Sequence, residues 1–238
     1  MKKVILLSMI LVLGLAQNGF AVPMSGTISG PSNGLYGTHA WSDASLSWEV
    51  EETSPGVWQY DYEFIVDAKE ISHVIFEVSE DFEACDGTDP DCDPATDNIL
   101  AGTTTGWIYD DNYSSTNPGN SNPYMPATIP GLKWNFSGLT TINVTLVTDK
   151  EPMWGDFYAV DGKKPGEEVY AYSTGFGLST DAVIGSGNAM DSEGHAWVLV
   201  PDTNGGGGGG QDVPEPSTFL LLGFGLAGAG LLRRRIKN

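Results

Sequence analysis

The sequence has almost no positive charge outside its two ends. Between residues 4 and 232 there is no arginine, and the only basic residues are Lys69, Lys133, Lys150, Lys163 and Lys164. This absence excludes bidentate recognition of phosphate by guanidinium groups in that part of the chain. All 31 acidic residues lie there too, so residues 22–218 carry a formal charge of −26. Nucleic acid and anionic lipid are therefore poor partners. Divalent cations and neutral or basic ligands are compatible with this negative charge. Alternatively, the acidity serves only to keep the protein soluble.

Sequence signatures of common enzyme classes are also absent. The chain has no Gly-x-Ser-x-Gly elbow, no His-Glu-x-x-His pair, no phosphate-binding loop and no dinucleotide fingerprint. Its three histidines, His39, His73 and His195, lie far apart in the sequence, which favours structural or surface roles over a metal or acid–base cluster. A catalytic pair of carboxylates stays open, but among 31 acidic residues no pair can be singled out.

The first 21 residues have the build of a secretory signal peptide. Lys2 and Lys3 give a positive start, Val4–Ala16 is apolar throughout most of its length, and Gly19-Phe20-Ala21 has small residues at its first and third positions. We expect export through the Sec translocon and cleavage after Ala21. The apolar stretch is shorter than the about 20 residues that a spanning helix needs, and without a cysteine near the cut no lipoprotein anchor is expected.

Only two cysteines are present, Cys85 and Cys92. In an exported protein a disulfide between them is the natural outcome. Closing this short loop contributes roughly 2.5 kcal/mol in the chain-entropy model. A metal–thiolate site is the alternative, but further cysteine ligands and nearby histidine ligands are missing.

The segment around the cysteines, residues 80–104, is acidic and contains a run of carboxylates at Asp89, Asp91, Asp93 and Asp97. Carboxylates with this spacing can converge on one Ca²⁺ ion, and they partly follow positions 1, 3, 5 and 9 of an EF-hand loop. The segment departs from that loop because Pro94 replaces the turn glycine and Leu100 replaces the bidentate glutamate. Calcium binding and a solvated acidic loop held by the disulfide both stay open.

The central part of the sequence predicts an all-β fold. Seven Trp, nine Tyr and nine Phe accompany 31 Gly and 14 Pro, and no long amphipathic helical pattern is present. The clearest strand is Val57–Asp67, in which Trp58, Tyr60, Tyr62, Phe64 and Val66 alternate with mostly polar residues. After a polar break, Ile71–Ser79 resumes with β-branched and aromatic residues, so the two runs predict a hairpin.

Further strands are expected at Ser45–Glu51, Gly106–Asp110, Leu132–Phe136, Thr140–Thr148, Asp156–Val160, Glu168–Ser173 and Ala196–Val200. Many short strands with turn residues between them indicate two packed antiparallel sheets. We therefore predict a single antiparallel β-sandwich or jelly-roll-like domain over residues 22–203.

Aromatic residues in and beside the long connection 111–131 suggest a second kind of ligand. Exposed aromatic rings on a β-sandwich can stack on sugar rings, and the best candidates are Trp107, Tyr109, Tyr113 and Tyr124. The alternative is that these rings serve the hydrophobic core, as most aromatic residues do in a domain of this size.

The chain ends with a tripartite tail. A glycine run, Gly205–Gly210, lies in a flexible linker over residues 204–212, and the extended sequence Val213-Pro214-Glu215-Pro216-Ser217-Thr218 follows it. Phe219–Leu232 is uniformly apolar, and the next residues are Arg233, Arg234 and Arg235. A helix over residues 217–232 would rise roughly 24 Å and span a bilayer if the arginines snorkel. The arginines orient it with the tail inside and the domain outside.

This tail resembles the PEP-CTERM sorting signal over residues 213–238. The resemblance rests on the motif Val213, Pro214, Glu215 and Pro216, the Gly/Leu-rich helix, and the terminal arginine cluster. It implies that an exosortase in the membrane recognises the Pro-Glu-Pro motif and removes the tail, in bacteria that make exopolysaccharide and biofilm. More weakly, Trp154–Gly162 is similar to a stretch in the β-rich domains of some PEP-CTERM proteins, which implies no activity.

These observations predict an exported protein that is held transiently in the membrane and then placed at the cell surface or outside the cell. The first hypothesis for its role is a non-enzymatic surface or matrix protein associated with exopolysaccharide. The second is a carbohydrate- or Ca²⁺-binding module, and the third is a secreted hydrolase with paired carboxylates. The second predicts a metal cage or exposed aromatic rings, and the third predicts two close carboxylates with a raised pKa.

Overall fold

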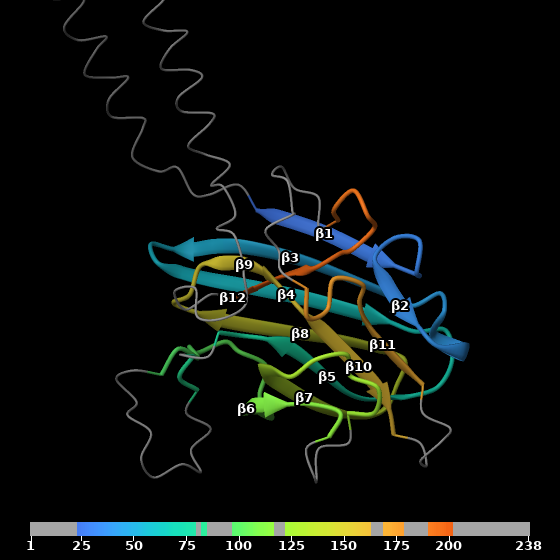
Figure 1. Ribbon diagram of the computed structural model, residues 1–238. Helices are drawn as coiled ribbons and strands as arrows, with labels where there is room; N and C mark the ends of the chain where they lie inside the picture. Colours follow the sequence, from blue (N-terminus) through green and yellow to red (C-terminus); the bar gives the residue numbers. More distant parts are fainter. Residues whose placement is uncertain are drawn as a thin grey trace, which may run out of the picture. The chain divides into compact units, whose positions relative to one another are not determined.

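The computed structural model describes residues 23–79, 82–84, 97–116, 122–162, 169–178 and 190–201 (Figure 1). These residues form antiparallel sheets and one short 3-10 helix, His39–Trp41, and no α-helix occurs among them. The strands are β1 (Met24–Ser29), β2 (Leu35–Gly37), β3 (Ser45–Ser54), β4 (Val57–Ile65), β5 (Ile71–Glu77), β6 (Trp107–Tyr113), β7 (Ile129–Leu139), β8 (Thr141–Thr148), β9 (Pro152–Gly155), β10 (Phe157–Asp161), β11 (Tyr170–Ser173) and β12 (Val198–Pro201). The all-β prediction is therefore confirmed for the described residues.

Several predicted features lie outside these residues. They are the signal peptide 1–21, the cysteine pair Cys85 and Cys92, the aspartates Asp89, Asp91 and Asp93, the linker 204–212 and the sorting tail 213–238. Within the described part of the chain, no helix is long and apolar enough to cross a membrane.

The first sheet has four strands in the order β1-β3-β4-β8. Strand β4 forms as the sequence predicts: Trp58, Tyr60, Tyr62 and Phe64 are buried, while the residues between them are half-buried or exposed. Strand β1 needs glycine at position 26, because a Cβ there would lie only 2.2 Å from the indole ring of Trp48 on the neighbouring strand β3. The sheet thus has one apolar face, which packs inward, and one polar face.

The second sheet has six strands in the order β2-β11-β10-β5-β7-β6. Its central strands do not alternate in burial, since every residue of β10 is buried and β5 is buried at Ile71 and over residues 73–76. A strand in this position is covered on both faces, and it therefore carries a continuous apolar run, as at residues 74–76 of β5 and 157–160 of β10.

The two sheets face each other across an aromatic core. The rings of Tyr62 and Phe76 stack at a centroid distance of 3.9 Å, and Phe64 and Phe157 lie 5.1 Å apart. Each such pair contributes about 0.5–1.5 kcal/mol beyond the area it buries. The two-stranded sheet of β9 and β12 packs against the inner face of the four-stranded sheet. Trp154 contacts Trp48 edge-on, and the Tyr62 hydroxyl donates to the carbonyl of Leu199 at 2.8 Å.

The predicted hairpin between the fourth and fifth strands is wrong. Strand β4 pairs with β3 and β8, whereas β5 belongs to the other sheet and pairs with β7 and β10. Both edges of β4 are occupied, so β5 has no place beside it. The break at 66–70, where Lys69 has φ +70° and the Trp41 indole donates to the carbonyl of Ala68, carries the chain from one sheet to the other.

The other predicted strands exist, with ends that move by up to three residues. Strands β1, β2 and β9 were not expected from the sequence. β2 and β9 are only three and four residues long, and β1 is interrupted by Gly26. Each of the three forms by pairing with a neighbouring strand.

Candidate functional site

Three of the four predicted sugar-stacking residues lie on β6 and do not form a common surface. Trp107 and Tyr109 pair with Trp134 and Leu132, so they lie on the inward-facing side at the edge of the six-stranded sheet. A bulge between Asp110 and Tyr113 places the third predicted residue, Tyr113, on the opposite side of the sheet.

Tyr113 is 1% exposed, packs in an apolar cluster and donates its hydroxyl to the carbonyl of Ile108 at 3.0 Å. The stacking prediction is therefore wrong for Tyr113, because burial against the sheet leaves no open ring face.

The fourth predicted residue, Tyr124, is the most exposed of the large hydrophobic side chains in the described part of the protein, at 61%. Its ring stacks on Tyr170 at a centroid distance of 5.1 Å and an interplanar angle of 20°. Its backbone φ is +60°, a conformation that is strained for an aromatic residue.

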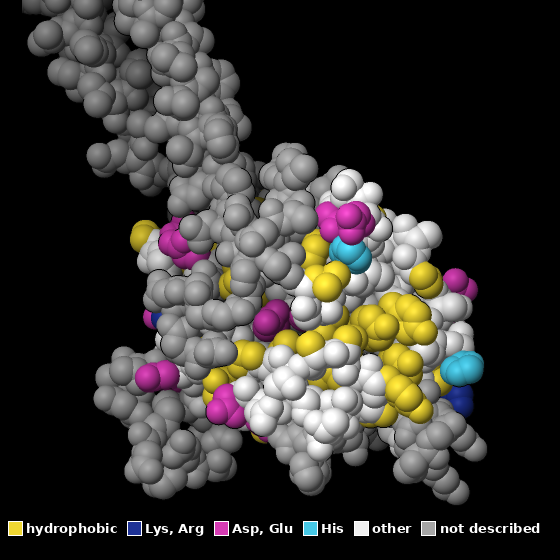
Figure 2. Space-filling view, in the orientation of Figure 1, with side chains coloured by type: hydrophobic (Ala, Val, Ile, Leu, Met, Phe, Trp, Pro, Cys, Tyr) yellow, Lys and Arg dark blue, Asp and Glu magenta, His cyan; other side chains and the backbone are white. Residues whose placement is uncertain are grey.

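Tyr124 is one member of a cluster that we name the tyrosine surface: Tyr36, Tyr124, Tyr170 and Tyr172. Tyr36 and Tyr172 are cross-strand partners on β2 and β11, with ring centroids 4.8 Å apart. Tyr170 lies two residues before Tyr172 on the same face of β11, and these two rings are nearly parallel, at 9°. In Figure 2 hydrophobic side chains gather over β2 and β11.

The floor beneath the tyrosine surface is the outer face of the six-stranded sheet. Ile75, Met125, Tyr158, Val160 and Phe176 are buried there, and Tyr170 and Tyr172 pack against this cluster. Phe176 meets Tyr172 edge-on at 6.2 Å. Burial raises the pKa of both Tyr170 and Tyr172, and neighbouring tyrosines add to the effect, so the phenols keep their protons at neutral pH.

Sequence reasoning found Tyr124 but missed its three neighbours. The pattern Tyr170-Ala171-Tyr172 was a usable signal, because alternation within a predicted strand places two tyrosines on one face. Tyr36 had no such signal, since it joins the cluster only through the pairing of β2 with β11.

A pair of carboxylates, the half-buried Glu77 and the buried Asp156, lies near one end of the same sheet. A Glu77 carboxylate oxygen accepts the backbone N–H of Asp156 at 2.8 Å. The Asp156 carboxylate accepts the Ser173 hydroxyl at 3.3 Å and the backbone N–H of Gly177 at 2.7 Å.

Burial raises the pKa of both Glu77 and Asp156, and for Glu77 the charge of Asp156 adds to that effect. Close carboxylates with raised pKa values are what the hydrolase hypothesis predicted. However, Asp156 is 3% exposed, and both of its oxygens are occupied by groups of the protein.

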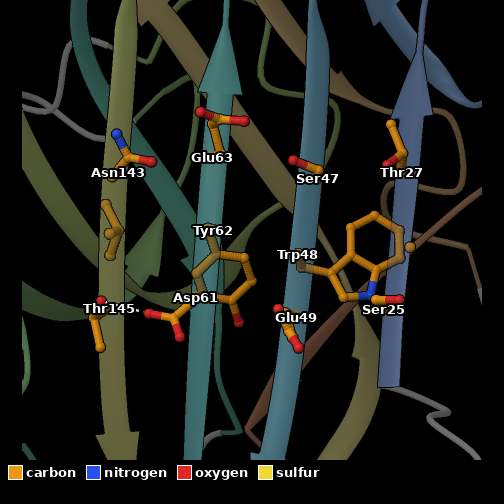
Figure 3. A pocket seen from close by; sticks show the side chains of 12 residues that line it. Ser25, Thr27, Ser47, Trp48, Glu49, Asp61, Tyr62, Glu63, Asn143 and Thr145 are labelled. Carbon is orange, nitrogen blue, oxygen red and sulfur yellow. Dashed lines mark hydrogen bonds between the residues drawn. The ribbon is translucent and has the colours of Figure 1, made fainter. Parts of the chain in front are cut away.

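The outer face of the four-stranded sheet is hollowed into an open groove of about 550 Å³. Two rows of polar side chains cross the sheet in Figure 3: Thr27, Ser47, Glu63 and Asn143 form one row, and Ser25, Glu49, Asp61 and Thr145 form the other. The Asp61 carboxylate accepts Gln59 Nε2 at 2.7 Å and the Thr145 hydroxyl at 2.5 Å. The groove offers hydroxyl, amide and carboxylate groups for hydrogen bonds.

Two of the three histidines, His73 and His195, have side-chain partners. His73 Nε2 donates to Asn122 Oδ1 at 2.9 Å, and burial lowers the pKa of His73 to about 3, with the nearby charge of Lys133 acting in the same direction. His195 Nδ1 lies 2.9 Å from an Asp191 carboxylate oxygen.

In the described part of the chain no three His, Cys, Asp or Glu side chains are placed to hold a metal ion. Asp97 is the only described member of the predicted calcium set, and its carboxylate accepts the backbone N–H of Ile99 at 2.9 Å. The calcium site stays a prediction, as does the disulfide.

Comparison with known proteins identifies the C-terminal tail. A family model described as the PEP-CTERM protein-sorting motif matches residues 212–235. No curated protein and no solved structure matches the chain. The motif implies an exported protein that is sorted to the cell surface and processed by an exosortase. The match confirms the predicted sorting tail and does not extend to the β-domain.

Proposed function

We propose that this protein is a non-catalytic component of the cell surface or extracellular matrix that associates with exopolysaccharide. In this proposal the Sec translocon exports the chain, the signal peptide is removed after Ala21, and the C-terminal helix holds the protein in the membrane until an exosortase cuts near Pro214-Glu215-Pro216. The released part is a β-sandwich of jelly-roll type.

The observation that carries the proposal is the tyrosine surface. Four tyrosine rings from β2, β11 and the turn before β7 lie together on one face, and one of them is 61% exposed. A group of half-buried rings with one exposed ring costs solvation free energy unless a ligand covers it, and tyrosine combines an apolar ring with a hydroxyl that can bond to a polar partner. A polysaccharide offers both apolar C–H faces and hydroxyl groups.

A non-catalytic role is proposed because the described carboxylates with raised pKa values, half-buried Glu77 and buried Asp156, serve as hydrogen-bond acceptors for the protein itself. Asp156 uses both carboxylate oxygens to hold Ser173 and Gly177, and Glu77 holds the backbone N–H of Asp156. A general acid or base needs an oxygen within hydrogen-bonding reach of a substrate. These two residues instead fix the junction between β9 and β10 to the turn that follows β11.

Co-sedimentation tests this function. The exported protein, purified from culture, is mixed with exopolysaccharide from the same cells, and the pellet and supernatant are assayed for protein and for reducing ends. We expect the protein in the pellet and no rise in reducing ends over the time of the assay. Protein that stays in the supernatant contradicts the association, and a steady release of reducing ends contradicts the non-catalytic role.

A further inference from the structure

We infer that the tyrosine surface is a binding site for a neutral pyranose chain, with Tyr124 as its main stacking ring. This inference rests on the proposed function, which states only that the protein associates with exopolysaccharide. It adds the residue that makes the contact and the class of sugar that fits.

The turn that carries Tyr124 is fixed from below. On one side of it, buried Asn122 accepts a hydrogen bond from His73 at 2.9 Å. The carbonyl of Pro123 accepts the hydroxyl of buried Tyr158 at 2.8 Å, and Met125, on the other side, is 3% exposed. Tyr124 is therefore the one residue of this turn that points away from the core, although its neighbours are anchored.

The backbone at Tyr124 is strained. Its φ of +60° lies in the left-handed region, where glycine or asparagine is the usual residue. A residue held in such a conformation costs of order 1–3 kcal/mol and is a pointer to function. The turn would form at least as well with glycine, so the ring at this position is present for its contacts, which are the stack on Tyr170 and whatever meets its exposed face.

The ring of Tyr124 is presented in a way that suits a sugar. Its electron-rich face attracts the weakly positive C–H groups on the apolar face of a pyranose, by the same quadrupole that orders aromatic pairs. Tyr170 stacks on it at 5.1 Å, and Tyr172 lies nearly parallel to Tyr170, whereas Tyr36 is tilted by 31° relative to Tyr170. Because Tyr170 covers one face of the Tyr124 ring, the 61% exposure of Tyr124 leaves the other face for a sugar.

The charge of the protein selects against anionic sugars. Residues 22–218 contain no arginine and five lysines against 31 acidic residues. A uronic acid or sulfated polymer would meet a repulsive field and no guanidinium partner. Burial raises the pKa of Tyr170 and Tyr172, so these two phenols keep their protons and can donate hydrogen bonds to neutral hydroxyl groups.

Affinity electrophoresis of the exported protein tests the inference. Native gels contain either hydroxyethylcellulose, a neutral pyranose polymer, or alginate, an anionic one. We expect retardation by hydroxyethylcellulose and none by alginate. Tyr124→Gly removes the ring and suits the backbone conformation, so it should fold and bind about tenfold more weakly. Tyr124→Phe keeps the ring and should bind within about twofold of the unchanged protein.

Ile108→Ala is the matched control. Ile108 is 44% exposed and lies on the outer face at the opposite edge of the same sheet, paired with Lys133, so its loss should leave retardation unchanged. If Tyr124→Gly binds as tightly as the unchanged protein, or alginate retards more than hydroxyethylcellulose, the inference is wrong while the association with polysaccharide stands. If neither polymer retards the protein and its own exopolysaccharide does not pellet it, the proposed function fails as well.

Discussion

The outer faces of the two sheets differ in what covers them. On the four-stranded sheet, Glu49, Glu63 and Asn143 are exposed and line an open polar groove. On the six-stranded sheet, Ile75 and Tyr158 are fully buried, because other segments of the chain lie over them. One sheet thus faces solvent directly, and the other carries a second apolar layer.

This second layer explains where the tyrosine surface comes from. Met125 and Phe176, from two connections outside the sheet, cover its middle, while the edge formed by β2 and β11 stays open. The covering segment fixes the turn at Tyr124 beside that edge. A sheet with solvent on its outer face has no such layer from which to hold an exposed ring in a strained conformation.

The largest expected effect follows from the difference in cover. Ile75→Ala removes a fully buried side chain from the outer face of β5, and we expect the free energy of unfolding to fall by about 3 kcal/mol. Asn143→Ala changes an exposed residue on the outer face of β8 and should alter it by less than about 0.5 kcal/mol. Urea titration of both variants of the exported protein measures the difference. Equal losses would show that the two outer faces are not distinct.

The same difference sets what sequence reasoning could predict about the fold. Strand β4 was clear, because a strand with one solvated face alternates and Tyr60 and Tyr62 stand against Asp61 and Glu63. Strand β5 was recognised as a strand but assigned to the wrong partner. Its burial on both faces results from segments distant in the sequence, and no local pattern records which strands lie beside it.

A smaller effect should appear when pH changes. Burial raises the pKa of Glu77 and Asp156, so the folded state keeps protons that the unfolded chain releases. This contribution to stability is complete below the unfolded pKa values, at about 4, and it is lost as pH rises from there to the raised folded values. We expect the melting temperature to drop by several degrees between pH 7 and pH 9, measured by circular dichroism. His73, whose pKa is lowered to about 3, acts in the opposite direction, but only below about pH 6.5.

Glu77→Gln separates this pair from other titrations. Glutamine keeps a side-chain oxygen for the backbone N–H of Asp156 and removes one of the two ionisable groups. We expect the variant to lose less stability between pH 7 and pH 9 than the unchanged protein. An identical slope in both proteins would mean that other groups cause the pH dependence.

The candidate site was predictable only in part. Tyr124 could be proposed because it lies in a long connection rich in Asn, Pro and Ser, where exposed rings are expected. The same reasoning proposed Trp107 and Tyr109, but the register of β6 with β7 places them on the inward side of the sheet. The cluster depends on β2 pairing with β11 across 135 or so residues of sequence, a distance over which single-residue patterns carry no information.

The smallest expected effect concerns the strain at Tyr124, and its sign is unusual. Alanine is normally the better residue for stability, because glycine leaves more freedom in the unfolded chain. At a φ of +60° the order reverses, since alanine keeps the clash that glycine avoids. We therefore expect Tyr124→Gly to be more stable than Tyr124→Ala by about 1 kcal/mol in urea titration. Both variants lose the ring contact with Tyr170, so that contact cancels in the comparison. If Tyr124→Ala were equal or more stable, the turn would relax once the ring is gone, and the strain would belong to the ring's contact with Tyr170 instead of to the anchored backbone.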